Sequence, residues 1–118
     1  MSQIQVQLDS DAVRPGQELT GTVSWSLQQH RGDRIVVRVF WYTQGKGTED
    51  LGVVDEKTIP SPATAATERF SFRVPAFPWS YAGTLMAITW AVEATVEPKG
   101  AVDRKQFVLG PNGQEVHA

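Results

Sequence analysis

The sequence has no cysteine, no long run of apolar residues and little excess charge. Without cysteine there can be no disulfide, thiol nucleophile or thiolate metal ligand, and this favours a reducing compartment. No window approaches the roughly 20 apolar residues that a membrane-spanning helix needs. The segment from Met1 to Leu8 alternates polar and apolar residues, which is unlike a signal peptide. We therefore expect a cytoplasmic protein without a membrane span.

A surplus of positive charge is also missing. The chain has 11 Lys and Arg against 13 Asp and Glu, which gives a net charge of −2, and its basic residues are scattered. Binding to nucleic acid needs cations that neutralise phosphates. The composition therefore argues against a nucleic-acid partner.

Helical periodicity is absent as well. Apolar residues alternate with polar ones in short runs, and this period of two is typical of half-buried strands. At 118 residues, the chain has the usual size of one domain with one core. We expect a single domain over residues 1–110 and a flexible C-terminal tail over residues 111–118.

Seven runs of this alternation predict seven strands, separated by loops rich in Gly and Pro. The pattern favours an all-β, immunoglobulin-like antiparallel β-sandwich over an open sheet. Asp55, Glu56 and Lys57 predict that their strand lies at an edge, because charged side chains resist further pairing. The expected strands cover residues 4–8, 19–27, 34–43, 51–59, 70–74 and 86–97, with a seventh that ends at 107–109. The inward phase of the seventh strand stays open.

Three tryptophans, Trp25, Trp41 and Trp90, fall on the inward faces of their strands and predict a large share of the core contacts. We also expect a loop that crosses between the sheets at 61–67 and a structured corner at 75–83.

Two glycines have predicted roles. Pro15 and Gly16 predict a tight turn, because Pro fixes φ and Gly tolerates positive φ. Gly21 lies within a strand, where it would allow either a bulge or the close approach of a bulky neighbouring side chain.

Two stretches resemble arrestin-like domains. In the first, a Pro-Gly turn leads into a strand that carries Gly-x-Val, namely Arg14-Pro15-Gly16-Gln17-Glu18-Leu19-Thr20-Gly21-Thr22-Val23. The second resembles the Pro-x-Ser-Tyr-x-Gly corner of that family with its flanking strands, and it consists of Phe70-x-Phe72-x-Val74-Pro75, Pro78-x-Ser80-Tyr81-x-Gly83 and Ile88-x-Trp90-x-Val92-x-Ala94. The resemblance implies one immunoglobulin-like sandwich, similar to half of an arrestin or to microbial single-domain arrestin-like proteins. It implies an adaptor or scaffold that binds through strand edges and loops without chemistry.

Catalytic and cofactor motifs are not found. Residues 16–22 have the glycine spacing of a phosphate loop, but they lack its lysine and no helix follows. No Gly-x-Ser-x-Gly elbow exists to expose a nucleophile. His30 and His117 are the only histidines, and without cysteine they predict no zinc site. We expect no enzyme activity and no cofactor.

Two further patterns have ordinary explanations. Arg31-Gly32-Asp33 matches an adhesion tripeptide, but it lies where a hairpin turn needs polar residues and Gly. Asp9 with Asp11, and Glu49 with Asp50, are acidic pairs of the kind that could bind calcium, although such loop carboxylates are usually only solvated. We expect no metal site.

The outward row of the third strand is the main candidate for partner binding. Phe40 and Tyr42 lie beside Arg38, and aromatic residues with arginine are enriched in protein interfaces. The alternative is that a loop or the seventh strand covers them. Phe77 and Trp79 at the corner are a second candidate, although packing into the end of the sandwich is favoured for them. The candidate partner-binding residues are Arg34, Val36, Arg38, Phe40, Tyr42, Phe77 and Trp79.

The expected function is binding of a protein partner, either by strand addition to an exposed edge or through the Phe40 and Tyr42 surface. Two alternatives stay open. The same surface could join identical copies into a structural homo-oligomer. Trp79, Tyr81 and the loop acids could instead bind a small ligand or, with calcium, a carbohydrate.

Overall fold

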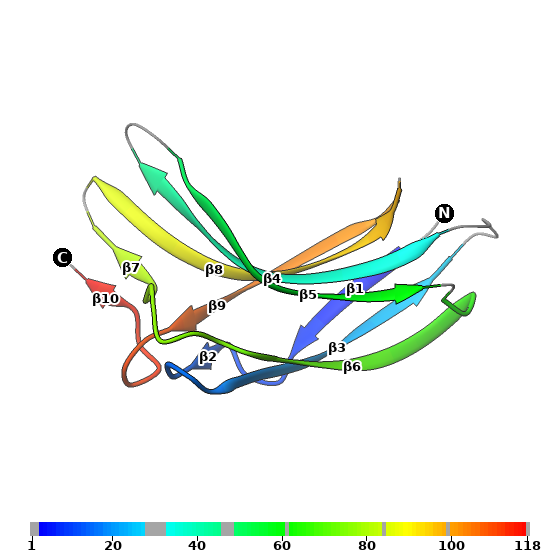
Figure 1. Ribbon diagram of the computed structural model, residues 1–118, viewed down its shortest axis with the longest axis horizontal. Coiled ribbons are helices and arrows are strands. Elements are labelled where there is room, and N and C mark those ends of the chain that lie inside the picture. Colours follow the sequence, from blue (N-terminus) through cyan, green and yellow to red (C-terminus); the bar gives the residue numbers. More distant parts are fainter. Residues whose placement is uncertain are drawn as a thin grey trace.

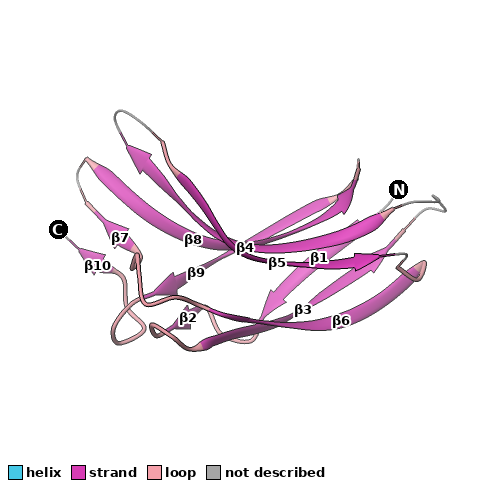
Figure 2. Ribbon diagram, in the orientation of Figure 1, coloured by secondary structure: helices cyan, strands magenta, loops and turns pink. Residues whose placement is uncertain are grey.

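The computed structural model describes residues 3–27, 33–45, 49–60, 62–83, 85–98 and 100–117 of the chain. These residues form strands and loops, with no helix among them (Figure 2). The strands are β1 (Gln3–Leu8), β2 (Ala12–Val13), β3 (Glu18–Ser26), β4 (Arg34–Gly45), β5 (Leu51–Pro60), β6 (Ala65–Arg73), β7 (Tyr81–Ala82), β8 (Met86–Glu97), β9 (Val102–Leu109) and β10 (Val116–His117).

The strands form two sheets. The smaller has the order β1-β3-β6, and the larger runs β10-β7-β8-β4-β5, with β9 paired to both β8 and β2. The long strands pair antiparallel throughout. Figure 1 shows the larger sheet bowed above the smaller one, with the hairpin ends of β4, β5 and β8 rising away from it. The predicted all-β sandwich is confirmed.

The core lies between the sheets and uses the inward faces that the alternation predicted. On β3, Leu19, Val23 and Trp25 are buried, while the polar residues between them are partly exposed. Trp90 at the centre of β8 is fully buried. Trp41, which pairs with it on β4, is half-buried and packs against the core. Burial of each such side chain stabilises the fold by roughly 1.5–3 kcal/mol, and the predicted inward position of all three tryptophans is confirmed.

Gly21 lies where β1 and β6 both approach β3 closely. A Cβ atom at this position would lie 2.3 Å from the carbonyl oxygen of Gln7 and 2.8 Å from the Cζ atom of Phe70. The structure therefore confirms one of the two predicted roles of Gly21, the close approach of a bulky neighbouring side chain. The Phe70 ring occupies the space that a side chain at this position would need.

The predicted turn before β3 is also present. Gly16 has a φ of +79°, in the left-handed region that glycine adopts without strain. The N–H of Gln17 donates to the carbonyl of Arg14 over 3.1 Å and closes the turn.

The connection between the sheets is shorter than predicted. It leads from β5 in the larger sheet to β6 in the smaller one, but β6 begins at Ala65 and not after Thr67. Ala66 faces inward and packs against the core beside its pairing partner Trp25. Alanine carries a weak hydrophobic signal, which explains the misplaced boundary. Ser61 lies outside the described residues.

The segment predicted as a flexible tail contains a short strand. Val116 and His117 pair in parallel with β7, and the N–H of Val116 donates to the carbonyl of Ser80 over 2.9 Å. Two residues are too few to carry a period of two, so the sequence pattern could not predict this strand. Ala118 lies outside the described residues.

A carboxylate of the opposite sheet closes the free edge of β1. The N–H of Val6 donates to Asp103 of β9 over 2.8 Å. Asp103 pairs with the buried Ala94, so its side chain lies on the core face at the rim of the sandwich. Burial raises the pKa of Asp103, but hydrogen bonds from Val6 and Lys105 outweigh burial and hold that pKa below its ordinary value. An additional strand at β1 would have to displace this charge.

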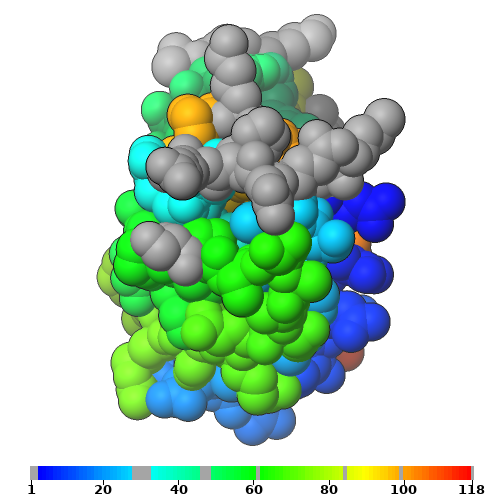
Figure 3. All heavy atoms as spheres, turned by 90° about the vertical axis from the view of Figure 1, so that its right-hand side faces the viewer, coloured from blue at the N-terminus to red at the C-terminus, as the bar shows by residue number. Residues whose placement is uncertain are grey.

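Charged side chains also close the opposite side, where β5 and β6 adjoin (Figure 3, green). The ammonium group of Lys57 on β5 donates to the carbonyl of Arg69 on β6 over 3.2 Å. The N–H of Glu56 donates to the carboxylate of Asp55 beside it over 2.8 Å. The prediction that these charged residues mark an edge strand is confirmed, because β5 ends the larger sheet.

The contacts of Gly21 predict the effect of a single methyl group. We expect Gly21→Ala to lower the free energy of unfolding by about 1–3 kcal/mol, because the new Cβ must push apart two strands. Urea denaturation of the variant measures this loss. Thr22→Ala, on the outward side of the same strand, serves as the control and should change stability much less. Equal stability of Gly21→Ala and the wild type would contradict the close approach.

Removal of the carboxylate at the β1 edge should promote association. We expect Asp103→Ala to self-associate at protein concentrations where the wild type keeps a constant mass, because the Val6 N–H becomes free for another strand. Sedimentation velocity over a concentration series measures this. Glu18→Ala removes an exposed carboxylate elsewhere and should behave as the wild type. If Asp103→Ala matches the wild type at every concentration, Asp103 does not protect the edge.

Candidate interaction surface on the outer face of the larger sheet

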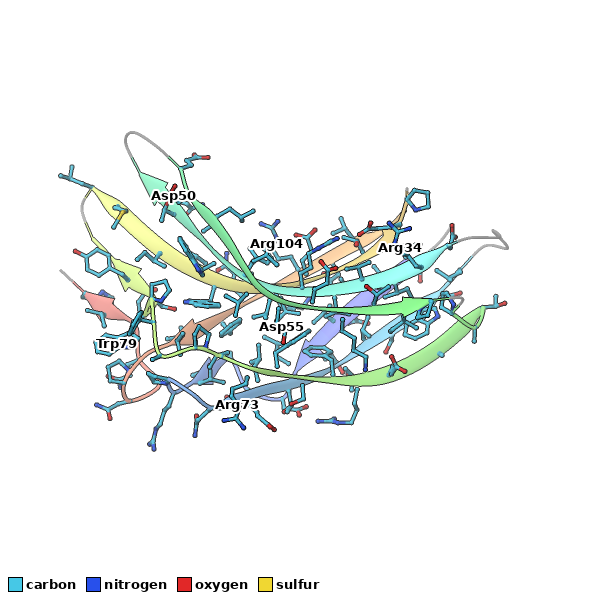
Figure 4. The ribbon with its side chains drawn as sticks, viewed as in Figure 1. Arg34, Asp50, Asp55, Arg73, Trp79 and Arg104 are labelled. Carbon is cyan, nitrogen blue, oxygen red and sulfur yellow. The ribbon has the colours of Figure 1, made fainter. Side chains whose placement is uncertain are left out.

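Opposite charges alternate across the outer face of the larger sheet. Arg38 on β4 pairs with Glu56 on β5 and with Glu93 on β8, and Glu93 in turn pairs with Arg104 on β9. Cross-strand pairs share one face of a sheet, so these four side chains form a row. Figure 4 shows Arg34 and Arg104 on this face, which turns away from the smaller sheet.

Ion pairs hold the predicted arginines of β4 in place. Arg38 donates to Glu56 and to Glu97 over 2.8 Å each, and Arg34 donates to Glu97 over 3.1 Å. The hydrogen bond from Arg38 lowers the pKa of Glu97 and outweighs the opposing effect of burial. The bond to Glu97 raises the pKa of Arg38. Both guanidinium groups are therefore already neutralised within the chain.

Val36 is not available to a partner, contrary to its place among the candidate residues. It points outward but has an exposed fraction of only 2%. Arg34 and Arg38 flank it on the same strand, and their side chains extend across the face to Glu97. The long side chains of this ion-pair network cover Val36.

Phe40 is also covered, and the seventh long strand supplies the cover. The Phe40 side chain is 5% exposed, and the Cζ atom of Arg104 on β9 lies 4.9 Å from its ring centroid. Glu93 accepts two hydrogen bonds from Arg104, at 2.7 and 3.2 Å. Ala91 pairs with Phe40 from β8, and its small side chain leaves room for the guanidinium group. Phe40 thus supports the surface and does not contact a partner.

Tyr42 stays half-buried at the edge of this arrangement. Its ring centroid lies 6.0 Å from that of Phe40 and 5.7 Å from the Cζ atom of Arg104. The amide nitrogen of Gln106 donates to its hydroxyl oxygen over 3.2 Å. Cation–π contacts and this hydrogen bond fix the orientation of the ring before any partner arrives.

Next to Tyr42 the surface has a hollow of about 360 Å³. Asp50 and Thr43 form its rim with two hydrogen bonds, from Asp50 N–H to the Thr43 hydroxyl (2.8 Å) and from Thr43 N–H to the Asp50 carbonyl (2.9 Å). Leu51 in its lining is 64% exposed, and Val53 beyond it is also exposed. We call it the outer hollow, lined by Phe40, Tyr42, Thr43, Gln44, Glu49, Asp50, Leu51 and Arg104.

The sequence pattern did not predict that Leu51 and Arg104 belong to this surface. Leu51 begins the predicted edge strand, where single exposed apolar residues need no explanation. Arg104 belongs to the strand whose phase stayed open. Phe107 and Leu109 are buried, which places Arg104 on the outer face. Counting back from these two inward residues with a period of two places Arg104 on the outward side, and this is the sequence signal that could have located it.

The two corner aromatics form a separate surface. Phe77 is 74% exposed and Trp79 is 41% exposed, so the favoured expectation that they pack into the end of the sandwich is wrong. The indole N–H of Trp79 donates to the carbonyl of Ala76 over 2.8 Å, and the indole of the buried Trp90 donates to the carbonyl of Pro78 over 2.7 Å. Figure 4 shows Trp79 at one end of the molecule, away from Arg104.

The remaining candidates gather no ligand set. Asp9 bonds to Thr20 and Arg69, which lower its pKa. His117 is exposed near Glu115. In residues 3–27, 33–45, 49–60, 62–83, 85–98 and 100–117, no three His, Cys, Asp or Glu lie together as metal ligands, and no helix could span a membrane. His30, Arg31 and Gly32 lie outside the described residues.

This arrangement of sheets defines an all-β sandwich of the arrestin-like type. No protein-family model matches the sequence, and a search of curated proteins finds no match. Among solved structures the chain is similar to Spo0M, a sporulation control protein from Bacillus subtilis, with a TM-score of 0.67 and 18% identity. The similarity covers 92% of this chain and 49% of that protein, so the chain spans about half its length. At this identity, the likeness shows the fold alone.

Two weaker likenesses involve enzymes. One is a β-glucosidase from Listeria innocua in complex with gluconolactone, with a TM-score of 0.49, 14% identity and coverage of 98% of this chain and 16% of that one. The other is the alkylpurine DNA glycosylase AlkC from Pseudomonas fluorescens bound to DNA, with a TM-score of 0.46, 9% identity and coverage of 92% and 30%. Likenesses this weak carry no argument about function.

The ion pairs on the outer face predict a dependence of stability on pH. The pKa of Glu97 is lower in the folded chain than its ordinary value of 4.5. The ionised carboxylate of Glu97 therefore stabilises the fold fully above the unfolded-state pKa, and this stabilisation is lost as the pH falls through the folded-state pKa. We expect Glu97→Gln to cost about 1 kcal/mol at neutral pH, with the difference from wild type shrinking below pH 4.5. Urea denaturation at several pH values measures it. Glu18→Gln is the control, and a difference that is the same at every pH would contradict this assignment.

Proposed function

We propose that this chain is a non-catalytic interaction module, an adaptor or scaffold of the arrestin-like type, that binds a protein partner through the outer hollow. The observation that carries the proposal is the exposed Leu51 beside an ordered aromatic and arginine surface. Interfaces concentrate their binding energy in a few such anchors, surrounded by groups that exclude water.

The rigidity of the outer hollow supports this function. Arg104 is bonded to Glu93, Tyr42 is bonded to Gln106, and Asp50 is bonded to Thr43. A surface that is ordered before binding loses less side-chain entropy when a partner arrives. These bonds therefore favour recognition at this face.

The capped edges argue against the other expected mode, addition of a partner strand. Asp103 and Lys57 bond to the edges of β1 and β6, and Asp55 bonds to an N–H of β5. A partner strand would have to break a charge-assisted hydrogen bond at each of these places. Binding by side chains in the outer hollow requires no such loss.

Sporulation control, the role printed for Spo0M, is regulatory and supports an interaction module over an enzyme. Cytoplasmic location is part of the proposal and rests on the absence of cysteine from the sequence. Binding of a second copy of the chain is the alternative for the same surface, and the experiment below detects it.

Leu51 and Val102 provide a matched test. Both are exposed on the outer face, at 64% and 59%, but Val102 lies away from the outer hollow at the start of β9. We expect Leu51→Ser to weaken partner capture from a lysate of the source organism at least tenfold, as expected for an anchor residue. Val102→Ser should retain it. Both variants should unfold within about 0.5 kcal/mol of the wild type, because neither side chain is buried.

Quantitative mass spectrometry of the captured proteins reads out this comparison. If only the chain itself is recovered, the partner at this surface is a second copy of the chain and not a different protein. Equal capture by Leu51→Ser and wild type, with the fold intact, would show that the outer hollow is not the binding surface.

A further inference from the structure

The charges around the outer hollow do not cancel. Its described lining includes two acidic residues, Glu49 and Asp50, and one basic residue, Arg104. Arg104 is already paired with the carboxylate of Glu93 at 2.7 Å. In the described part of the chain, no ion pair involves Glu49 or Asp50. The described lining of the hollow therefore has a net negative charge.

Three cations of the described strands are turned away from the hollow or neutralised. Lys57, on the same strand as Leu51, extends to the other side of the sheet, where its ammonium group lies 3.6 Å from Glu68. Arg34 and Arg38 are bound to Glu97. None of these three groups offers positive charge to the described rim, and carboxylates there favour a cationic partner.

Apolar surface borders this negative charge. Leu51 directly follows Asp50 in the chain and is largely exposed, and Val53 lies on the same face opposite Phe40. A ligand that fits the hollow therefore needs two features side by side, a positive charge for the rim and an apolar side chain for Leu51. Lysine and arginine supply the first within a polypeptide, and a neighbouring large apolar residue supplies the second.

On the basis of the proposed function, we propose that the outer hollow binds a protein segment in which a Lys or Arg side chain adjoins a large apolar side chain. The cation pairs with Glu49 and Asp50, and the apolar side chain packs on Leu51. An acidic segment is rejected by the same carboxylates. Arg104 provides no compensating attraction, because Glu93 occupies its guanidinium group.

Selection from a phage library of random 12-residue peptides tests this chemistry on the full chain. We expect enrichment of Lys or Arg next to a large apolar residue. A synthetic copy of an enriched peptide, measured by fluorescence anisotropy, should bind Glu49→Gln/Asp50→Asn at least about tenfold more weakly than wild type. It should also bind severalfold more weakly in 500 mM than in 50 mM NaCl, because salt screens exposed charge pairs.

The matched control removes two carboxylates elsewhere. Glu18→Gln/Glu115→Gln makes the same change in net charge, on β3 and before β10, and should bind the peptide as the wild type does. Equal weakening in both double variants would mean that only total charge matters and would overturn the inference.

The remaining outcomes separate this inference from the proposed function. If the enriched peptides are acidic or uncharged but bind Leu51→Ser more weakly than wild type, the inference of a basic segment is wrong. The outer hollow would then still be the binding surface. No enrichment, or peptides that bind Leu51→Ser unchanged, also overturn the inference. In either case, the capture experiment with Leu51→Ser and Val102→Ser still tests the proposed function, because it does not depend on the selected peptides.

Discussion

The hydrogen bond between Trp90 and Pro78 constrains much of this sandwich. An indole N–H that is buried without an acceptor costs free energy, and the Trp90 side chain, at the centre of β8, is fully buried. Its acceptor is the carbonyl of Pro78, so the corner before β7 must pass across the end of the core. The buried Ser80 follows two residues later and exchanges hydrogen bonds with Leu109, while its carbonyl accepts the N–H of Val116. The register of β9 and the position of β10 therefore depend on where Trp90 holds the corner.

The outer face shows how a solvent-facing sheet surface can become ordered without a covering layer. Small Ala91 on the central strand leaves a depression, and Arg104 reaches across it to the aromatic rings of β4. The guanidinium group is kept there by Glu93, not by burial. Arginine therefore acts here as a lid over Phe40, and its long side chain contributes packing as well as charge.

The sequence predicted the long strands because each buries one face, and burial imposes a period of two. It could not predict β2, β7 and β10, since two residues carry no period. The cover over Phe40 also escaped prediction, because it depends on the relative register of three strands that are far apart in the chain. Phe77 was misjudged for a different reason. The corner was correctly expected to be structured, but the backbone is anchored by Trp90 and Ser80, which leaves the Phe77 side chain outside.

For the candidate residues of β4, the sequence predicted the side of the sheet on which they lie but not their contacts there. The inward and outward sides of β4 follow directly from its alternation, and both arginines are where that alternation places them. Which outward side chains reach solvent depends on partners from β5, β8 and β9. Leu51 and Arg104 became recognisable only when the pairing placed them beside Tyr42.

The closure of the sheet edges has a consequence for how such a domain can be used in longer polypeptides. A closed barrel protects its strands by joining the first to the last, whereas this sandwich protects them with single side chains, Asp103 on one side and Lys57 on the other. The edges of β1, β5 and β6 are thus protected by side chains of the domain itself. Copies of this unit, or unlike domains, can be joined in series by short linkers while each keeps its own strand pairing. The fold is suited to being repeated, combined and exchanged as an independent block.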